Sequence, residues 1–382
     1  MAFGRSARRF LKSSARDIRD KLLPERVFTG TVPSYDGFAE APALGFGASL
    51  HSIDKKIEGL RHNKTRVLPG NEKLPSGFDT SGDAYRSAMR ELLLGTKFRD
   101  ASPAYTKSPL FTSDISEEVH RRVDRFRDCL APWINRVFPL KNAVVAEIGS
   151  GTGSSTLAFA PFVKRIHCFE IEPSTTAIAK KRLSLAGVEN VVFEDGLFDA
   201  NSPFVNAPTQ VDIILLIAVL EHLHFDEFKE ILRVAFGKLR PGGVILIGET
   251  PNRLSFNDYH SSWTPFSQWL PPEVVSEYYK YSPRVNYLED FGNMATVHGE
   301  RSPAFHERIV RWGRGVSFHD FELALGPQVH NMIVLDGWED EVRPLAPIFK
   351  DDEVLVDIFS NLKLNCHRAF ARSWLYLAIR KP

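Results

Sequence analysis

Cysteine and long apolar runs are both scarce in this chain of 382 residues. The three cysteines, Cys129, Cys168 and Cys366, are far apart and form no Cys-x-x-Cys pair. This pattern is typical of a reducing compartment and argues against a structural zinc site. The longest uninterrupted apolar run covers eight residues, 213–220, whereas a membrane-spanning helix needs about 20.

An excess of charge is also missing. The chain carries 48 Lys and Arg against 47 Asp and Glu, a formal net charge of +1, which argues against nucleic acid as a partner. No apolar core segment follows the basic N-terminal residues, so a signal peptide is not predicted. We therefore expect a cytoplasmic protein. Its length allows one catalytic domain with additions.

Residues 1–26 depart from this balance, with eight Lys or Arg against three acids. Their apolar residues can form one stripe of a helix: Phe3, Ala7, Phe10, Leu11, Ile18 and Leu22. A basic amphipathic helix can lie on an anionic membrane surface. We favour a frayed tail or a helix docked on its own domain, with peripheral membrane contact as the alternative.

The most informative stretch is 143–153, Ala-Val-Val-Ala-Glu-Ile-Gly-Ser-Gly-Thr-Gly. The apolar run at its start is typical of a parallel strand that is covered on both faces. Glycines at 149, 151 and 153 permit positive φ and a close approach of the backbone to a ligand. A predicted helix opens at Ser154, and its first N–H groups would face the same ligand. The stretch therefore predicts a nucleotide-type cofactor site.

Alternating strands and helices continue after this turn, with a helix predicted over 226–239. This alternation predicts a doubly wound α/β fold with a mainly parallel sheet. Glu147, Glu170 and Asp195 end the first three strands, where ligands of such sheets bind. A carboxylate at Glu170 can accept hydrogen bonds from both ribose hydroxyls of an adenosine, and Asp195 can meet the adenine amine. The further strands are predicted over 166–170, 191–196, 211–217 and 244–248.

Five motifs, which run from Glu147–Gly153 to Leu239–Gly243, resemble in their order the class I S-adenosylmethionine (SAM)-dependent methyltransferases. The resemblance is greatest to the branch that acts on small molecules and glycans. The resemblance covers about 115–252, and the segment 248–253 fits the same branch. It implies a Rossmann-like sheet of seven strands with an antiparallel last strand. The motifs are Glu147–Gly153, Glu170, Asp195-Gly196, Val219–Leu223 and Leu239–Gly243.

The resemblance implies SAM as the cofactor, with its methionine part at the glycine turn, its ribose at Glu170 and its adenine at Asp195. A nicotinamide dinucleotide is the alternative cofactor. That site needs a third glycine where this chain has Ser154, so the spacing disfavours it. The implied SAM-binding residues are Glu147, Gly149, Ser150, Gly151, Thr152, Gly153, Glu170, Ile171, Asp195, Gly196 and Ala218.

We predict an N-terminal extension over 1–111, with an irregular or helical cap over 27–111 and a helix near 83–94. The methyltransferase domain is predicted over 112–382. Its first helix is expected over 115–137, with Asp114 and Glu117 as a capping box. The alternating segment 315–325 and the apolar run 374–379 are predicted as the last two strands, with a helical insertion over about 326–372.

Aromatic residues are dense after the fifth strand, with ten in the 39 positions 253–291. Prolines are mixed with them, so neither a long helix nor a strand is predicted there. Aromatic faces pack well on sugars and flat ligands. We therefore predict a substrate lid over about 253–311, with a small satellite core under a long loop as the alternative.

Transfer of the SAM methyl group to a hydroxyl needs positioning and a group that removes the proton. The predicted catalytic residues are His260, His222 and Glu249; a histidine near its unperturbed pKa suits this task. The alternatives are a turn or adenosine-pocket role for His222 and loop support by Glu249. Transfer without a metal is expected, because the acids and histidines at 221–226 fit a polar helix start better than a metal site.

The predicted function is O-methylation of a glycan, a surface-polysaccharide precursor or a secondary metabolite, with a small-molecule or glycan acceptor as the partner. N-methylation of a small molecule and a non-catalytic SAM-binding scaffold are the alternatives. A nicotinamide oxidoreductase is disfavoured by the glycine spacing. The sequence leaves the acceptor and the oligomeric state open.

Overall fold

The computed structural model describes residues 47–60, 74–362 and 364–382, with side chains from residue 52 onward. All of them belong to one compact unit, Ala41–Pro382. The prediction of a basic helix over 1–26 lies outside the described residues. In the part of the chain that is described, no helix is both long enough and apolar enough to cross a membrane.

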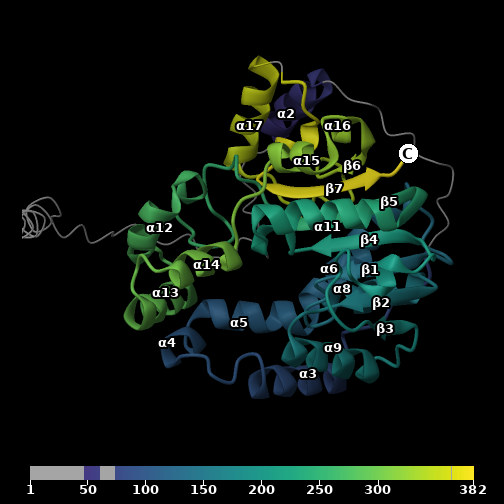
Figure 1. The fold of residues 1–382 in the computed structure, drawn as a ribbon, viewed down its shortest axis with the longest axis horizontal. Coiled ribbons are helices and arrows are strands. Elements are labelled where there is room, and N and C mark those ends of the chain that lie inside the picture. The colour runs from purple at the N-terminus through teal and green to yellow at the C-terminus, as the bar shows by residue number, and fades with distance from the viewer. Residues whose placement is uncertain (1–46, 61–73, 363) are drawn as a thin grey trace, which may run out of the picture. The chain divides into compact units, whose positions relative to one another are not determined.

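A seven-stranded sheet forms the centre of the unit, in the order β3-β2-β1-β4-β5-β7-β6 (Figure 1). The first five strands pair in parallel, whereas β7 runs antiparallel to both of its neighbours. The predicted α/β sheet with an antiparallel last strand is therefore confirmed. The strands are β1 Val144–Ile148, β2 Arg165–Phe169, β3 Val191–Phe193, β4 Val211–Ile217, β5 Leu239–Pro251, β6 Ile333–Asp336 and β7 Trp374–Arg380.

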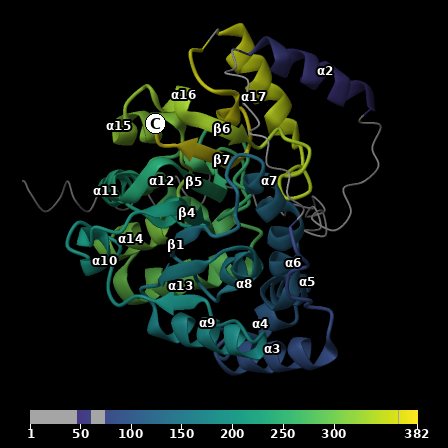
Figure 2. The ribbon, with the colours of Figure 1, turned by 90° about the vertical axis from the view of Figure 1, so that its right-hand side faces the viewer.

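Helices cover both faces of the sheet, because the central strands are apolar on both sides. Alternate residues enter different cores: Ile213 and Leu215 of β4 pack on one face, Ile214 and Leu216 on the other. Figure 2 shows α8 (Ser154–Phe159) on one side and α11 (Phe225–Lys238) on the other. Helix α9 (Pro173–Leu185) joins α8 on its face.

The helical segment before β1 starts earlier than predicted. It runs from α5 (Pro109–Ser116) to α7 (Ala131–Asn135), with α6 (Arg122–Arg125) between two π-helical turns, Glu117–Arg121 and Phe126–Leu130. The Ser108 side chain accepts from the Phe111 amide, and Pro109 follows it, which is a strong helix start. The predicted capping box is therefore wrong: Asp114 lies inside α5 and accepts from the Tyr105 hydroxyl.

The described part of the N-terminal extension contains α2 (Gly47–Gly59), α3 (Asp83–Gly95) and α4 (Pro103–Thr106). Helix α3 confirms the helix predicted near 83–94. Its Tyr85, Met89 and Leu93 share a hydrophobic core with β1 and α8. The domain boundary at residue 112 falls inside α5 and stays a prediction.

The predicted strand over 315–325 is wrong, because this segment forms helix α15 (Phe318–Leu325). The Asp320 carboxylate accepts from the Ser317 amide at 2.8 Å and completes a capping box. Phe321 is buried and Leu323 is 60% exposed, which fits a helix with one buried face. The strand beside β7 is β6 instead. The segment predicted as a helical insertion, about 326–372, contains helices α16 (Val329–Met332) and α17 (Lys350–Asn361) and also strand β6.

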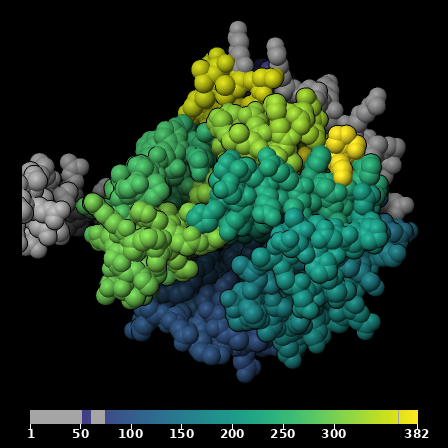
Figure 3. Space-filling model, viewed as in Figure 1, coloured from purple at the N-terminus to yellow at the C-terminus, as the bar shows by residue number. Residues whose placement is uncertain are grey.

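The segment after β5 is more helical than predicted, with α12 (Pro272–Tyr278), α13 (Val285–His298) and α14 (Pro303–Trp312). Its prolines stand at or before helix starts, where the missing N–H is harmless. Buried aromatic residues give these helices a small core of their own, as the satellite-core alternative predicts. In Figures 1 and 3 the segment lies beyond the carboxyl ends of the parallel strands, and the surface is hollowed beside it. The core residues are Tyr279, Tyr287, Phe291 and Phe305.

The helical form of 318–325 can be tested with a matched pair of variants. Phe321→Ala removes a fully buried ring and should lower the free energy of unfolding by about 3–5 kcal/mol. Leu323→Ala, two positions on, should change it by about 0.5 kcal/mol or less, because that side chain is 60% exposed. Denaturant unfolding measures both. A strand would place residues 321 and 323 on one face, so equal losses would contradict the helix.

Candidate active site

The glycine turn joins β1 to α8 and has three residues with positive φ: Gly149 at 69°, Gly151 at 53° and Gly153 at 82°. A Cβ atom at Gly149 would lie 2.7 Å from Val219 Cγ2, and one at Gly153 would lie 3.1 Å from Ala179 Cβ. A Cβ at Gly151 would meet nothing within 4 Å. The outer glycines therefore permit close packing, and the middle one borders open space.

Glu170 lies against this turn, just past the end of β2. Its Oε2 accepts from the Gly151 amide at 2.8 Å and its Oε1 from the Glu172 amide at 3.0 Å. These bonds fix the carboxylate at the carboxyl edge of the sheet and leave lone pairs for a ligand hydroxyl. The structure thus brings Glu170 and the glycine turn together, as the sequence predicted.

Asp195 and Gly196 follow β3, the next strand along this edge, and both are exposed. Two large apolar side chains flank them in the open: Ile171 is 76% exposed and Leu197 is 57% exposed. An adenine ring would cover such apolar surface while Asp195 accepts from its amine. The adenosine site at these residues stays a prediction.

Glu147 has a different surrounding from the other predicted cofactor residues. It is only 1% exposed, and its carboxylate accepts from the hydroxyls of Ser155 and Thr156 in the first turn of α8. Burial raises its pKa, which these hydrogen bonds partly offset. Glu147 therefore fixes the start of α8. Ser150 is likewise buried within the turn.

Arg182 on α9 is a residue that the sequence analysis missed. It is fully buried, and its guanidinium donates to the carbonyl oxygens of Thr152 at 2.7 Å, Val119 at 3.2 Å and Glu118 at 2.5 Å. It also donates to the Tyr85 hydroxyl at 3.0 Å. Arg182 thereby joins the glycine turn to two helices of the N-terminal half. No local pattern marks it, because its partners come from distant segments.

Thr152 is also held from the helical segment before β1. Its hydroxyl donates to Glu118 Oε2 at 2.7 Å. Burial raises the pKa of Glu118, but the cations of Lys97 and Arg122 outweigh this and lower it to about 2. Glu118 is therefore a carboxylate, and it holds Thr152 through a charge-assisted hydrogen bond.

Ala218 and Glu249 are strained, with φ of 54° and 52°. Ala218 follows β4, and Glu249 lies near the end of the neighbouring strand β5. The two strands are joined here, because the Ala218 amide donates to the Gly248 carbonyl at 3.0 Å. A non-glycine residue in this region costs of order 1–3 kcal/mol and is frequent at functional sites. The strain therefore marks the carboxyl ends of β4 and β5.

The Glu249 side chain is bound by two arginines from the helical segment before β1. Its carboxylate accepts from Arg122 and lies 3.9 Å from Arg125, which also pairs with Glu117 at 2.6 Å. These residues flank a π-helical turn, a feature common at functional sites. The arrangement makes Glu249 an ion-paired carboxylate, and the sequence analysis did not find its partners.

His222 and His260, the two predicted catalytic histidines, meet at a buried acid, Glu221. Glu221 Oε1 lies 3.6 Å from His222 Nε2 and 3.7 Å from His260 Nε2. The centroids of the two imidazole rings are 5.4 Å apart. Burial lowers the pKa of His222, and it lowers that of His260 well below the usual value, with His222, Arg284 and Arg122 adding to the effect. Both histidines are therefore neutral near pH 7.

A pocket of about 240 Å³ opens beside these histidines. The insertion after β5 supplies most of its wall. Arg284 lies between two indole rings, 5.2 Å from Trp263 and 4.9 Å from Trp312. The pocket is lined by His222, His260, Arg284, Arg308, Arg311 and Trp312.

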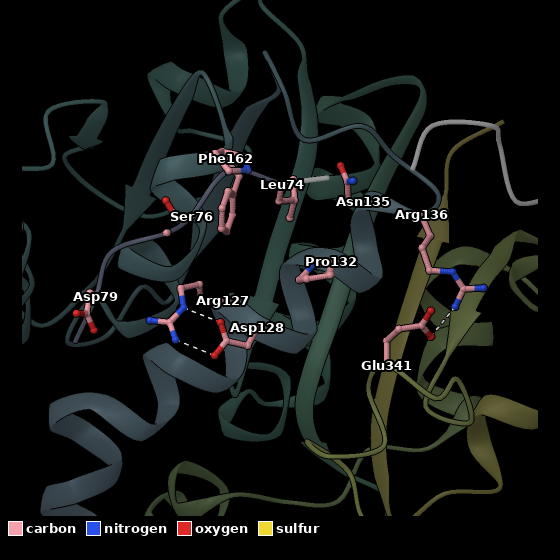
Figure 4. A pocket seen from close by; sticks show the side chains of 12 residues that line it. Leu74, Ser76, Asp79, Arg127, Asp128, Pro132, Asn135, Arg136, Phe162 and Glu341 are labelled. Atoms are coloured by element: carbon pink, nitrogen blue, oxygen red, sulfur yellow. Dashed lines mark hydrogen bonds and ion pairs between the residues drawn. The ribbon is translucent and has the colours of Figure 1, made fainter. Parts of the chain in front are cut away.

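A second hollow, of about 700 Å³, lies elsewhere (Figure 4). It borders Asn135, which precedes β1, and Phe162, which precedes β2. It is therefore at the amino ends of these strands, opposite to the glycine turn. Four of its charged side chains are paired, Arg127 with Asp128 and Arg136 with Glu341, and the Asp79 carboxylate accepts from the Ser81 amide and hydroxyl. Ligands of open α/β sheets bind at the carboxyl ends, so we place the active site at the smaller pocket.

The order of the sheet and the glycine turn after β1 agree with the predicted class I methyltransferase fold. Residues 146–245 match a family model described as "Methyltransferase domain". The predicted methyltransferase domain is thereby confirmed over these residues.

Individual relatives cover parts of the chain. It is 32% identical over 110 residues to a probable cobalt-precorrin-6B C(15)-methyltransferase (decarboxylating) of Methanothermobacter thermautotrophicus, a match that covers 28% of this chain and 53% of that protein. The chain thus spans about half the length of this curated relative.

Solved structures of methyltransferases are also similar. A precorrin-6y C5,15-methyltransferase from Geobacter metallireducens has 16% identity and a TM-score of 0.27, covering 34% of this chain and 62% of that one. A SAM-bound amino pentose methyltransferase from Micromonospora echinaspora has 20% identity and a TM-score of 0.30, covering 37% and 56%.

The role of Arg182 can be tested by Arg182→Met. The change leaves three buried carbonyl oxygens without their donor, and each such loss costs about 1–3 kcal/mol. We expect a loss of about 3–5 kcal/mol in the free energy of unfolding, together with weaker SAM binding, measured by denaturant unfolding and calorimetry. Lys181→Met, at an exposed position of the same helix, is the control. Equal behaviour of the two variants would show that Arg182 does not hold the turn.

Proposed function

We propose that this protein is a SAM-dependent methyltransferase that methylates a hydroxyl oxygen of a small molecule or glycan. The observation that carries the proposal is the cluster of Glu221, His222 and His260 at the same sheet edge as the glycine turn. Parallel pairing of β1 with β4 brings these two parts together. The Val219 side chain, three positions before His222, packs against Gly149.

The arrangement supports a position for each part of SAM. Adenosine would lie over Asp195 and Ile171, and its ribose would meet Glu170. The methionine part would follow the turn at Gly151, where the backbone borders open space. This direction points the methyl group toward the segment after β4, which holds His222. The sulfonium is a good leaving group, so the enzyme mainly aligns the acceptor and excludes water.

The pocket next to the histidines is where we place the acceptor. Its volume of about 240 Å³ suits a single sugar or aromatic ring. Trp312 offers an aromatic face for C–H groups, and Arg284 offers N–H donors for hydroxyl or anionic oxygens. The wall formed by His260, Arg284 and α14 supports the prediction that the insertion is a substrate lid.

Two neutral histidines favour oxygen over nitrogen as the methyl acceptor. When the methyl carbon leaves sulfur and bonds to oxygen, the acceptor also loses a proton, and S-adenosylhomocysteine leaves. A histidine that faces the hydroxyl and accepts this proton typically contributes 10²–10⁴-fold to the rate. An amine acceptor needs less help. His222 and His260 therefore belong to the catalytic machinery, whereas Glu249 positions Arg122 and Arg125.

A cytoplasmic location is part of the same proposal. Cys129, Cys168 and Cys366 are free, and the last two are buried. Free cysteines are ordinary in a reducing compartment. The absence of a helix able to cross a membrane among the described residues agrees with this placement.

Binding of SAM is the first test of the proposal. Gly151→Trp fills the open space beside the turn, and Glu170→Ala removes the predicted ribose acceptor. Calorimetry should show that each variant weakens SAM binding at least about tenfold, the effect of losing 1.4 kcal/mol. Glu189→Ala, which removes an exposed acid from the same part of the domain, should bind as the wild type does. If the wild-type chain binds no SAM, the proposal fails.

Methyl transfer is the second test, with methyl-labelled SAM and a panel of sugars, sugar phosphates and phenols. His260→Ala should lower transfer at least about 100-fold and leave SAM binding unchanged. His298→Ala, at an exposed position of α13, is the control. If His260→Ala keeps wild-type rates, His260 has no catalytic role. If the methyl group appears only on amines, the choice of oxygen is wrong.

A further inference from the structure

We propose that Glu221, His222 and His260 together bind one divalent first-row transition-metal ion. The proposal deepens the proposed function and rests on it for the catalytic role of the ion. One ligand atom of each residue lies within 4.8 Å of the other two. The two contacts of Glu221, at 3.6 and 3.7 Å, are too long for hydrogen bonds. Ligands of such an ion at about 2.0–2.2 Å from it stand roughly 3–3.5 Å apart, so a small inward shift would seat the ion.

Glu221 Oε1 supplies an independent reason to expect a ligand. The residue is fully buried, and this oxygen has no hydrogen-bond partner among the described residues. The other carboxylate oxygen has only a 3.4 Å contact from the Thr250 hydroxyl. An unsatisfied buried carboxylate oxygen costs at least about 1–3 kcal/mol. A cation between the oxygen and the two histidines would remove this cost.

Hydrogen bonds on the far side of each imidazole leave both Nε2 atoms without a proton. His222 Nδ1 lies 2.9 Å from the Arg311 carbonyl oxygen, which can only accept, so Nδ1 carries the proton. His260 Nδ1 lies 3.1 Å from Ser261 Oγ, whose own proton is donated to the Gly313 carbonyl at 2.8 Å. His260 is therefore also protonated on Nδ1. Such outer bonds orient metal-binding histidines.

Three electron-pair donors thus face one another with no hydrogen between them when Glu221 is ionised. Two of the arginines nearby are paired with acids, Arg122 with Glu249 and Arg311 with Glu227, and Arg284 donates to the His260 carbonyl oxygen. Their charges therefore do not replace a cation at the centre of the cluster.

Gly313 shows that the position of His260 is built into the fold. A Cβ atom at residue 313 would lie 2.5 Å from His260 Nδ1, and its φ of 129° is one that other residues rarely adopt. Only glycine leaves room for the imidazole at this place. Three segments therefore hold the proposed metal-binding residues in place. They are the turn after β4, the start of the insertion, and the residue after α14.

Two histidines and one carboxylate are a ligand set that suits Mn²⁺, Fe²⁺, Co²⁺ or Zn²⁺ and leaves positions open for other ligands. These positions face the 240 Å³ pocket, which both histidines line. An acceptor hydroxyl bound there would ionise more readily and release its proton to water. Its oxygen then bonds to the SAM methyl carbon as the carbon–sulfur bond breaks. In this form His222 and His260 hold the ion, in place of the metal-free transfer that the sequence suggested.

The composition of the site also explains why the sequence did not reveal it. His224 and Asp226, which stand close to Glu221 in the chain, point elsewhere: His224 Nε2 pairs with Glu307 at 2.5 Å and Asp226 with Lys229 at 2.7 Å. The third ligand comes from His260 in the insertion. Sequence spacing alone cannot show that these segments meet.

Metal titration of the full chain, without an affinity tag and stripped with a chelator, tests the proposal. Calorimetry with Mn²⁺ and visible absorption with Co²⁺ should show one ion per chain. Glu221→Gln, which keeps the side-chain shape, and His260→Ala should each weaken binding at least tenfold. His224→Ala should bind as the wild type does. Equal binding by all four proteins, or none by the wild type, would overturn the proposal.

A second readout separates this proposal from the proposed function. Unfolding temperatures of the stripped proteins, expected to be similar, show that the variants lose the site and not the fold. Metal binding without methyl transfer to any acceptor would sink the proposed function alone. Methyl transfer at the wild-type rate in excess chelator would sink the catalytic role of the ion and leave the methyltransferase in place.

Discussion

The parallel pairing of β4 with β1 on one side and with β5 on the other is the constraint on which the rest of the site depends. Parallel strands end at the same edge, so the chain leaves the sheet at three adjacent points. These points carry the glycine turn, the Glu221–His222 turn and Glu249. The chain has positive φ where it leaves β1 and β4, and Glu249 has positive φ inside β5, where the pairing with β7 is irregular. Backbone hydrogen bonds thereby place the glycine turn beside the turn that carries Glu221 and His222.

Side chains from outside the sheet then hold this edge in place. Arg182 reaches the glycine turn from α9, and Arg122 reaches Glu249 from the helical segment before β1. The Arg182 guanidinium is fully buried, and Arg122 makes a charge-assisted hydrogen bond to Glu249, so both contacts are directional and costly to break. The insertion after β5 adds His260 and the pocket wall. The N-terminal half and the insertion are therefore parts of the site, although neither carries the cofactor motif.

The sequence was sufficient for the parts whose determinants are local. The glycine turn, the acids at strand ends and the apolar strands are read from neighbouring residues, and these predictions agree with the fold. One error has a local cause as well: 318–325 alternates in polarity but also spaces Phe318, Phe321 and Leu325 as a helix does. Arg182 and the meeting of Glu221 with His260 were beyond reach, because both depend on contacts between distant segments. A buried arginine and a converging histidine look like surface residues until the packing is known.

Gly313 has a consequence for how this site can change in evolution. Its missing side chain is the space that the His260 imidazole occupies. A larger residue at 313 would push the imidazole away from Glu221, and without a ring at 260 the same glycine would leave a void. Neither position can drift by itself at low cost. Gly313 looks like an ordinary helix end, but the residue that fits there depends on the side chain at 260. We therefore expect positions 260 and 313 to be substituted together or not at all.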